Sequence, residues 1–332
     1  MKNLNIRYIL LLFACMGIFS CKKDELNSKE LLAYLKFDGG NGQVGNINFT
    51  RTLTSASGAS EIRLSGYLTR ETSADVSLSI SVDEAKLAEY NAANKTAYVL
   101  LPSANYEIEN GGSLDIKTGT TVSADSLKIR LKAREQLADP KGYVLPLSIT
   151  SVNSRDKGIQ PSSNYGTVYL VVSAMFDNID KSSKQPAPGT FIDRKNPAWR
   201  IVDASMSYSL ETKADAALDG DNNTSWFTSG ENGFITVDLA ANTVLKGVVL
   251  TPNYLYGSYY NATEIEVFIS EDNQSWISQG TYVADPVLED SSEEVPDYRN
   301  INFLSPVTCR YIKFVMKEYP NYGGFSEINA IK

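Results

Sequence analysis

The chain contains no histidine in its 332 residues, and this absence excludes several classes of chemistry. Ser-His-Asp and Cys-His nucleophile pairs, imidazole metal sites and the most common general base all require that side chain. Any catalysis would therefore depend on carboxylates, lysine, tyrosine or a cofactor.

Basic residues are also scarce. The 39 Asp and Glu residues outnumber the 31 Lys and Arg residues, which gives a formal net charge of -8, and the basic residues form no cluster beyond short pairs. Nucleic-acid affinity depends mainly on cationic contacts with phosphate, so this composition argues against a nucleic-acid partner. The length predicts two domains, and the 42% hydrophobic and 21% charged contents are those of an ordinary globular protein.

Long hydrophobic runs are missing as well. The apolar run over residues 8–19 is shorter than the roughly 20 residues that a membrane-spanning helix needs. It follows Lys2 and Arg7, as in the hydrophobic region of a secretory signal peptide. We therefore expect residues 1–20 to be a signal peptide.

The end of this run, Ile18-Phe19-Ser20-Cys21, resembles a bacterial lipoprotein signal. The resemblance implies lipidation of Cys21, membrane anchoring and a tether over residues 21–30. The following Lys23-Asp24-Glu25 is similar to the signal that directs Bacteroidetes-type lipoproteins to the outer face of the outer membrane, which predicts a lipid-anchored protein that faces the cell exterior. The alternative is a cleaved signal peptide with an incidental cysteine.

Only three cysteines are present. Cys15 would leave with the signal peptide and Cys21 would be acylated, so no intrachain disulfide could form. Cys309 would remain as a free thiol, and with no histidine to activate it we expect a buried structural residue.

Alternating apolar and polar residues predict an antiparallel β-sandwich over residues 31–176. Such alternation is the signature of strands with one buried face. We predict strands over residues 76–82, 127–131, 143–149 and 165–172, and a short helix over residues 84–91 that Asp83 can cap. Pro146 favours an edge strand or a bulge, since proline cannot donate to a sheet.

Parts of this half also resemble a known family. The resemblance is to the uncharacterised N-terminal domain family of Bacteroidetes surface lipoproteins, and it implies an immunoglobulin-like sandwich of unknown activity. It rests on Tyr90-Asn91, residues 98–102, Tyr106 and residues 143–147. Residues 177–196 then contain two prolines and few large apolar side chains, which predicts a semi-stiff linker.

The last part of the chain, residues 197–332, again has short alternating strands and predicts a second antiparallel sandwich. Its motifs resemble, in order, an F5/8 type C (discoidin) domain of the branch called carbohydrate-binding module family 32, whose fold is a jelly-roll sandwich. The motifs are residues 217–226, 235–239, 267–276, 310–314 and 325–328. The resemblance implies core positions for Trp226 and Trp276.

Alternating oxygen-bearing side chains at Asp219, Asp221 and Asn223 are typical of a loop that could hold a hard cation such as Ca²⁺. The spacing does not continue as an EF-hand. The family resemblance implies a structural Ca²⁺ held by the Asp219, Thr224 and Glu327 side chains and by backbone oxygens near Ala216, Asp221 and Ser326. The alternative is an Asp-Gly turn without an ion.

Aromatic residues gather in two loops near the C-terminus. A ring can pack on the apolar face of a sugar while amides and hydroxyls bond its substituents. The resemblance implies that both loops lie at one end of the sandwich and form a sugar site, for which the candidates are Tyr254, Tyr256, Tyr259, Asn261, Tyr322 and Phe325, with Asn253 and Thr228 as polar partners. The alternative is a rim of half-buried rings without a ligand.

We therefore expect a non-catalytic surface lipoprotein that binds a glycan or polysaccharide, accessory to polysaccharide capture. Galactose-binding members of the family typically use a histidine and an arginine, which this chain lacks at the corresponding loop, so galactose specificity does not transfer. The alternative is an adhesion or scaffold protein that binds a protein partner. A glycoside hydrolase would need two suitably spaced acids in a cleft, and neither half resembles a hydrolase.

Overall fold

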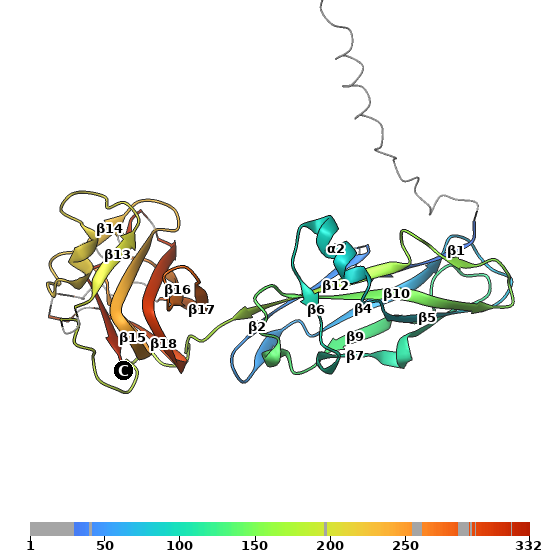
Figure 1. Ribbon diagram of the computed structural model, residues 1–332, viewed down its shortest axis with the longest axis horizontal. Helices are drawn as coiled ribbons and strands as arrows, with labels where there is room; N and C mark the ends of the chain where they lie inside the picture. Colours follow the sequence, from blue (N-terminus) through green and yellow to red (C-terminus); the bar gives the residue numbers. More distant parts are fainter. Residues whose placement is uncertain are drawn as a thin grey trace, which may run out of the picture. The chain divides into compact units, whose positions relative to one another are not determined.

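The computed structural model describes residues 30–39, 42–195, 198–253, 261–284, 292, 294–295, 297–319 and 321–332 (Figure 1). Two compact units are present. The first contains the chain up to Ile47, Ser60–Lys132 and Lys141–Ser173, and the second contains Asn48–Ala59, Ala133–Pro140 and Ala174–Lys332. The predicted all-β architecture is confirmed for both halves of the chain.

Two sheets form the sandwich in the first half of the chain. One has the order β11-β1-β4-β9-β7 and the other β3-β2-β12-β10-β5-β8, with β6 paired to β10. Their bounds are β1 Leu32–Phe37, β2 Val44–Arg51, β3 Ala56–Gly58, β4 Glu61–Leu68, β5 Val76–Val82, β6 Val99–Leu100, β7 Tyr106–Ile108, β8 Ser113–Ile116, β9 Leu127–Leu131, β10 Tyr143–Ser154, β11 Gln160–Pro161 and β12 Thr167–Phe176.

The alternating strands behave as predicted. In β5, Val76, Leu78 and Ile80 are buried while the serines between them are half-buried or exposed, and β9 shows the same pattern. The apolar side chains point inward because only one face of each sheet is covered. The strands at 76–82 and 127–131 are therefore confirmed.

Two local predictions in this half are wrong. The helix α2 spans Lys86–Asn94 and begins after Ala85 without a side-chain cap. Asp83 instead accepts a hydrogen bond from the Ser148 hydroxyl at 3.0 Å, while its backbone carbonyl closes a turn with the Lys86 N–H. The Asp83 carboxylate therefore accepts a hydrogen bond from a residue of β10 and does not cap the helix.

Pro146 lies in β10, a central strand, and not at an edge. On one side β10 pairs first with β6 at Tyr143 and Val144 and then with β5 from Leu147 onward. Pro146 falls between these two ladders, and its carbonyl accepts a hydrogen bond from the Asp83 N–H at 3.1 Å. A residue without an N–H is tolerated there because neither partner strand requires that donor.

The second unit contains the predicted jelly-roll sandwich. Its main sheet has the order β13-β15-β18-β16-β17, with β20 paired to β15, and β14 pairs with β19. The strands are β13 Arg200–Ala204, β14 Trp226–Thr228, β15 Phe234–Thr251, β16 Glu264–Ser270, β17 Ile277–Val283, β18 Arg299–Glu318, β19 Gly323–Phe325 and β20 Glu327–Ile331. Short 3₁₀ helices occur at η3 Ser103–Asn105, η4 Glu109–Gly112, η5 Arg134–Gln136 and η6 Ala214–Leu218.

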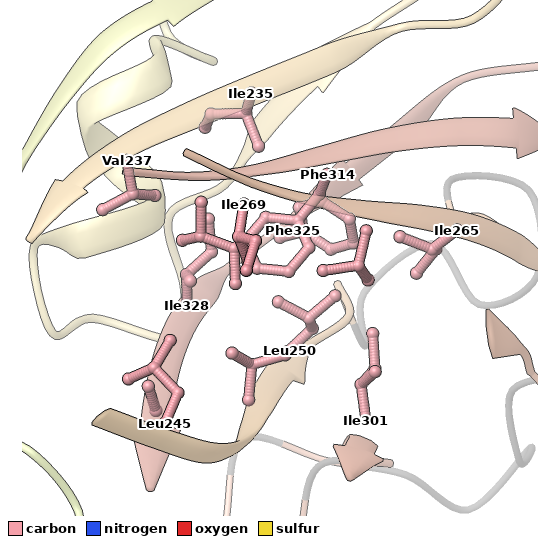
Figure 2. Close-up of a cluster of buried hydrophobic side chains, with 14 of the residues drawn as sticks. Ile235, Val237, Leu245, Leu250, Ile265, Ile269, Ile301, Phe314, Phe325 and Ile328 are labelled. Carbon is pink, nitrogen blue, oxygen red and sulfur yellow. The ribbon is translucent and has the colours of Figure 1, made fainter. Parts of the chain in front are cut away.

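The long strands β15 and β18 pair with each other along most of their length. Their pairing shifts register between Asp238 and Thr243, where Ala240 has a positive φ of 65°. Short alternating strands were expected in this part of the chain, whereas β15 is one long bent strand. Its side chains line a core with β16, β18 and β20, including Ile235, Leu250, Ile265, Phe314 and Ile328 (Figure 2).

The predicted linker is wrong near its two ends, because Ile179 and Ile192 pack in the second core and the backbone at residues 180 and 190 is hydrogen-bonded to it, whereas most side chains between them are exposed. Ile179 is 3% exposed and bridges Phe303. The buried Asn178 side chain donates to Gln279 and to the Ser305 carbonyl, and Ser305 N–H donates back to it. Farther on, Thr190 and Lys332 exchange backbone hydrogen bonds. The prediction failed because polar residues such as Asn178 are typical of linkers, whereas here the Asn178 amide forms buried hydrogen bonds with Gln279 and Ser305.

Candidate functional site

The pairing of β14 with β19 positions the candidate site. Trp226 lies opposite Phe325, and Thr228 lies opposite Gly323. A Cβ atom on Gly324 would overlap the Trp226 carbonyl oxygen and lie 2.6 Å from Cδ1 of Phe227. The two backbones can therefore approach this closely only because position 324 carries no side chain.

Phe325 faces inward from this pair. Its ring is 2% exposed and lies 6.2 Å from both the Trp226 and the Phe314 ring centroids (Figure 2). The prediction that Phe325 contacts a ligand is wrong, because the ring faces the core. Trp226 is fully buried, as expected, whereas Trp276 is only partly buried and has the Lys313 ammonium 4.0 Å from its ring centroid.

The predicted polar partners form a buried network. Asn253 donates from Nδ2 to Ser225 Oγ at 2.5 Å, and Ser225 and Ser326 share a hydrogen bond of 2.7 Å. The Asn253 N–H donates to Asn261 Oδ1, and Asn261 Nδ2 donates to the Asn253 carbonyl, both at 3.0 Å. Asn253, Asn261 and Thr228 are each 3% exposed or less.

These three side chains therefore lie inside the protein and not on a ligand-facing surface, which corrects their predicted role as direct contacts. The Asn253 and Asn261 bonds join the two ends of the segment 254–260. The candidates Tyr254, Tyr256 and Tyr259 lie outside the described residues.

Tyr322 is the described aromatic candidate that reaches the surface, and it has a partner that the sequence analysis missed. The Tyr208 ring packs edge-to-face on it, with ring centroids 4.5 Å apart and an interplanar angle of 61°. Tyr208 is 57% exposed, and its N–H donates to the Phe227 carbonyl at 2.8 Å. The bond fixes the Tyr208 backbone beside β14, next to Thr228.

The loop that carries Tyr208 has an inverted alternation. Met206 and Leu210 are 88% and 85% exposed, whereas the serines beside them are half-buried. Ser205 Oγ accepts the Phe234 N–H at 2.9 Å, and Ser209 N–H donates to Thr212 Oγ1 at 3.0 Å. The alternating pattern at 205–210 could have revealed this segment in the sequence, but alternation alone does not say which side chains face solvent.

The loop predicted to hold an ion is closed by hydrogen bonds around Asp219. The Thr224 hydroxyl lies 2.7 Å from Asp219 Oδ2, to which it donates, and 3.0 Å from the Asp221 carbonyl oxygen. The Asp221 N–H donates to Asp219 Oδ1 at 2.9 Å, as in the Asp-Gly turn without an ion. The same carboxylate, hydroxyl and carbonyl oxygens are of the kind that Ca²⁺ binds, so their donor chemistry fits that ion. The Asp221 carboxylate does not join them, because it bonds Asn223.

Glu327 faces this loop from β20. Its Oε1 accepts the Gly220 N–H at 2.5 Å, and its Oε2 pairs with Arg194. Burial raises the pKa of Glu327 above its ordinary value, although Arg194 and the Gly220 N–H oppose that rise. Ser326, beside it, is fully buried, and Ala216 lies in η6.

Other functional groups are few. Among the described residues, Asp, Glu and Cys form no cluster of three that could hold a metal, so any ion would depend on hydroxyl and carbonyl oxygens as well. Within the same described ranges, no helix has the length and apolarity that crossing a membrane requires.

Comparison with known proteins agrees with the fold. Residues 201–331 match the F5/8 type C domain, and residues 27–156 match a family of N-terminal domains. No curated protein matches the chain. A two-domain protein of unknown function from Bacteroides fragilis is 18% identical, with a TM-score of 0.55 over 100% of both chains.

Single-domain structures align with the second half. An F5/8 type C domain from Bacteroides fragilis is 24% identical, with a TM-score of 0.39 over 44% of this chain and 98% of that one. A family 32 carbohydrate-binding module from Clostridium perfringens, determined with galactose, is 18% identical, with a TM-score of 0.33 over 40% of this chain and 99% of that one.

Proposed function

We propose, from the F5/8 type C domain that residues 201–331 form, that this protein binds a glycan at the surface around Tyr208 and Tyr322. The observation that carries the proposal is the edge-to-face tyrosine pair, one ring of which is 57% exposed. Exposed rings of this kind can pack on the apolar faces of pyranose rings. Tyr254, Tyr256 and Tyr259, outside the described residues, are proposed as further contacts.

The tyrosine pair supports binding without requiring turnover. The two rings supply a stacking surface, and their phenol hydroxyls supply hydrogen bonds. A receptor needs no more than these interactions. We therefore propose a non-catalytic receptor.

The remaining parts of the proposal concern anchoring and the ion. Lipidation at Cys21, in the signal-like N-terminal sequence, would anchor the protein at the outer membrane surface, where it would assist polysaccharide capture. Asp219, Thr224 and Glu327, with backbone oxygens at Asp221, Ala216 and Ser326, would hold a structural Ca²⁺. The ion would offset the negative charge of the loop carboxylates and stiffen the loop.

The proposal is tested with a glycan array probed with residues 22–332. We expect Tyr208→Ala and Tyr322→Ala each to weaken binding about fivefold, because one ring contact contributes about 1 kcal/mol. Tyr311→Ala is the matched control, since it removes a ring from the outer face of β18, opposite Asp238 and Ser270. Binding that is equal in all four proteins would contradict the proposed site.

A second candidate function has one observation in its favour. Met206 and Leu210, on the loop of Tyr208, are exposed aliphatic side chains of the kind that contact protein partners. An adhesion or scaffold role predicts no binding on any glycan surface together with specific capture of one surface protein. That capture should be lost in a Met206→Ser/Leu210→Ser variant.

A further inference from the structure

Glu327 requires a positive partner. Its side chain is 4% exposed, and an ionised carboxylate removed from water without a compensating charge is strongly unfavourable. The nearest acidic neighbour, Asp219, adds to this cost because the two carboxylates repel each other.

Arg194 supplies such a charge from an unexpected part of the chain. Its guanidinium Nη1 contacts Glu327 Oε2 and also donates to the Ile328 carbonyl at 3.0 Å. The Arg194 side chain is only 17% exposed, so solvent screens this ion pair less than a surface pair. The residue lies in the segment that the sequence had indicated to be a linker.

The segment around Arg194 is fixed to the second core. Ile192 N–H donates to the Ala330 carbonyl at 3.0 Å, and the Arg194 carbonyl accepts the Trp199 N–H at 2.9 Å. The first bond holds the backbone beside β20, on which Glu327 lies, and the second joins Arg194 to the buried Trp199. Arg194 therefore reaches Glu327 from a fixed position.

Glu327 is shared between two partners. One carboxylate oxygen faces Arg194, and the other accepts the Gly220 N–H within the Asp219–Thr224 loop. An ion in that loop and the Arg194 guanidinium would thus compensate the same buried charge. Each would reduce the dependence of Glu327 on the other.

We propose that Arg194 is a built-in cation of the ion loop, which keeps the domain folded without Ca²⁺ and lowers the stabilisation that Ca²⁺ provides. The inference rests on the proposed calcium site. It predicts that loss of Arg194 converts a domain that depends weakly on calcium into one that depends strongly on it.

The test is the melting temperature of residues 22–332 in excess chelator and in millimolar Ca²⁺, followed by circular dichroism. We expect Ca²⁺ to raise the melting temperature of the wild-type protein by about 2 °C or less and that of Arg194→Met by about 5 °C or more. The larger rise is expected because Glu327 would be a buried charge without its arginine partner. Arg200→Met is the matched control. This variant removes one of the two arginines that pair with the buried Asp238, and Arg310 remains. Its calcium-dependent rise in melting temperature should equal that of the wild type.

A second variant guards against failure to fold. Arg194→Met/Glu327→Gln removes both charges, so it should melt above Arg194→Met in chelator and show no calcium shift. Equal calcium shifts in wild type and Arg194→Met, no shift in any protein, or a double variant less stable than Arg194→Met would each overturn the inference. A protein that binds no glycan but shows the expected shifts would contradict only the proposed glycan site.

Discussion

At the scale of single residues, Gly324 shows how one backbone position determines the candidate site. The absence of a side chain allows β19 to approach β14 and places Tyr322 beside Tyr208. A larger residue would have to separate the two strands. The ring pair would then lose its support.

We expect Gly324→Ala to lower the free energy of unfolding by about 1 to 3 kcal/mol, because the new methyl group overlaps backbone. Glycan affinity should fall with it. Gly230→Ala is the control, since a Cβ at that position meets no atom within 4 Å. Denaturant unfolding of both variants checks the prediction, and equal midpoints for the two variants would contradict it.

Cys309 leads to a pH-dependent prediction. The side chain is fully buried, and burial raises the pKa of its thiol from 9.0 to about 12. Between these two values the unfolded chain loses the thiol proton while the folded protein retains it. Stability should therefore fall as the pH rises through this window.

The free energy of unfolding is measured between pH 9 and 11 for the protein of residues 22–332 and for its Cys309→Ala variant. We expect a steeper decline in the protein that keeps the thiol. Iodoacetamide at pH 8 should label Cys309 only after denaturation. Rapid labelling of the native protein would show that the thiol is accessible.

The sequence allowed part of the site to be predicted at this scale. Asp219 and Thr224 are hydrogen-bonded, and Glu327 bonds Gly220 between them; the alternation of oxygen-bearing residues indicated the loop, and the family resemblance implied Glu327. Phe325 and Thr228 were predicted to contact a ligand but are buried. A residue type alone does not indicate whether its side chain lies on the inner or the outer face of the β14–β19 pair. Tyr208 was missed because its partner, Tyr322, is more than 100 positions away along the chain.

At the scale of elements, the segment 178–192 is an integral edge of the second core. Its Asn178 amide and Ile179 side chain are buried, and its backbone pairs with the last strand region. A domain that begins after this segment would expose those surfaces. The family match that begins at residue 201 does not include it.

We therefore expect a fragment of residues 197–332 to be much less stable than one of residues 177–332, by several kcal/mol, because it loses the Asn178 hydrogen bonds and the Arg194 ion pair. Thermal melting of the two fragments measures the difference. Asn178→Ala in the longer fragment should produce an intermediate loss. Identical melting of both fragments would mean that the segment adds no stability.

Strand positions were more predictable than their boundaries. Alternation located β5 and β9 because each has one buried face, but it could not reveal that one bent strand spans residues 234–251. That continuity depends on the register shift around Ala240. The presence of Pro146 in a central strand likewise could not be predicted, because it depends on Pro146 lying between the segments of β10 that pair with β6 and with β5.

At the scale of the whole molecule, the chain combines two β-sandwich halves with an N-terminal sequence that carries the predicted anchor. The fold class could be predicted from composition and alternation together. The proposed lipid attachment point, Cys21, lies outside the described part of the chain.

We expect Cys21→Ser to abolish incorporation of labelled fatty acid and to move the protein from the membrane fraction to the soluble fraction, because a thioether needs the sulfur atom. Cys15→Ser is the control and should still be lipidated. Detergent phase partitioning and metabolic labelling provide the measurement. Labelling that persists in Cys21→Ser would exclude this anchor.

Met206 has a consequence of another kind. Its sulfur atom lies on a side chain that is 88% exposed, whereas Met316 is fully buried in the core. Peroxide should therefore convert Met206 to the sulfoxide long before it reaches Met316, and the apolar tip beside Tyr208 would become polar. The binding surface of this protein would then be sensitive to oxidative stress while its fold stays intact.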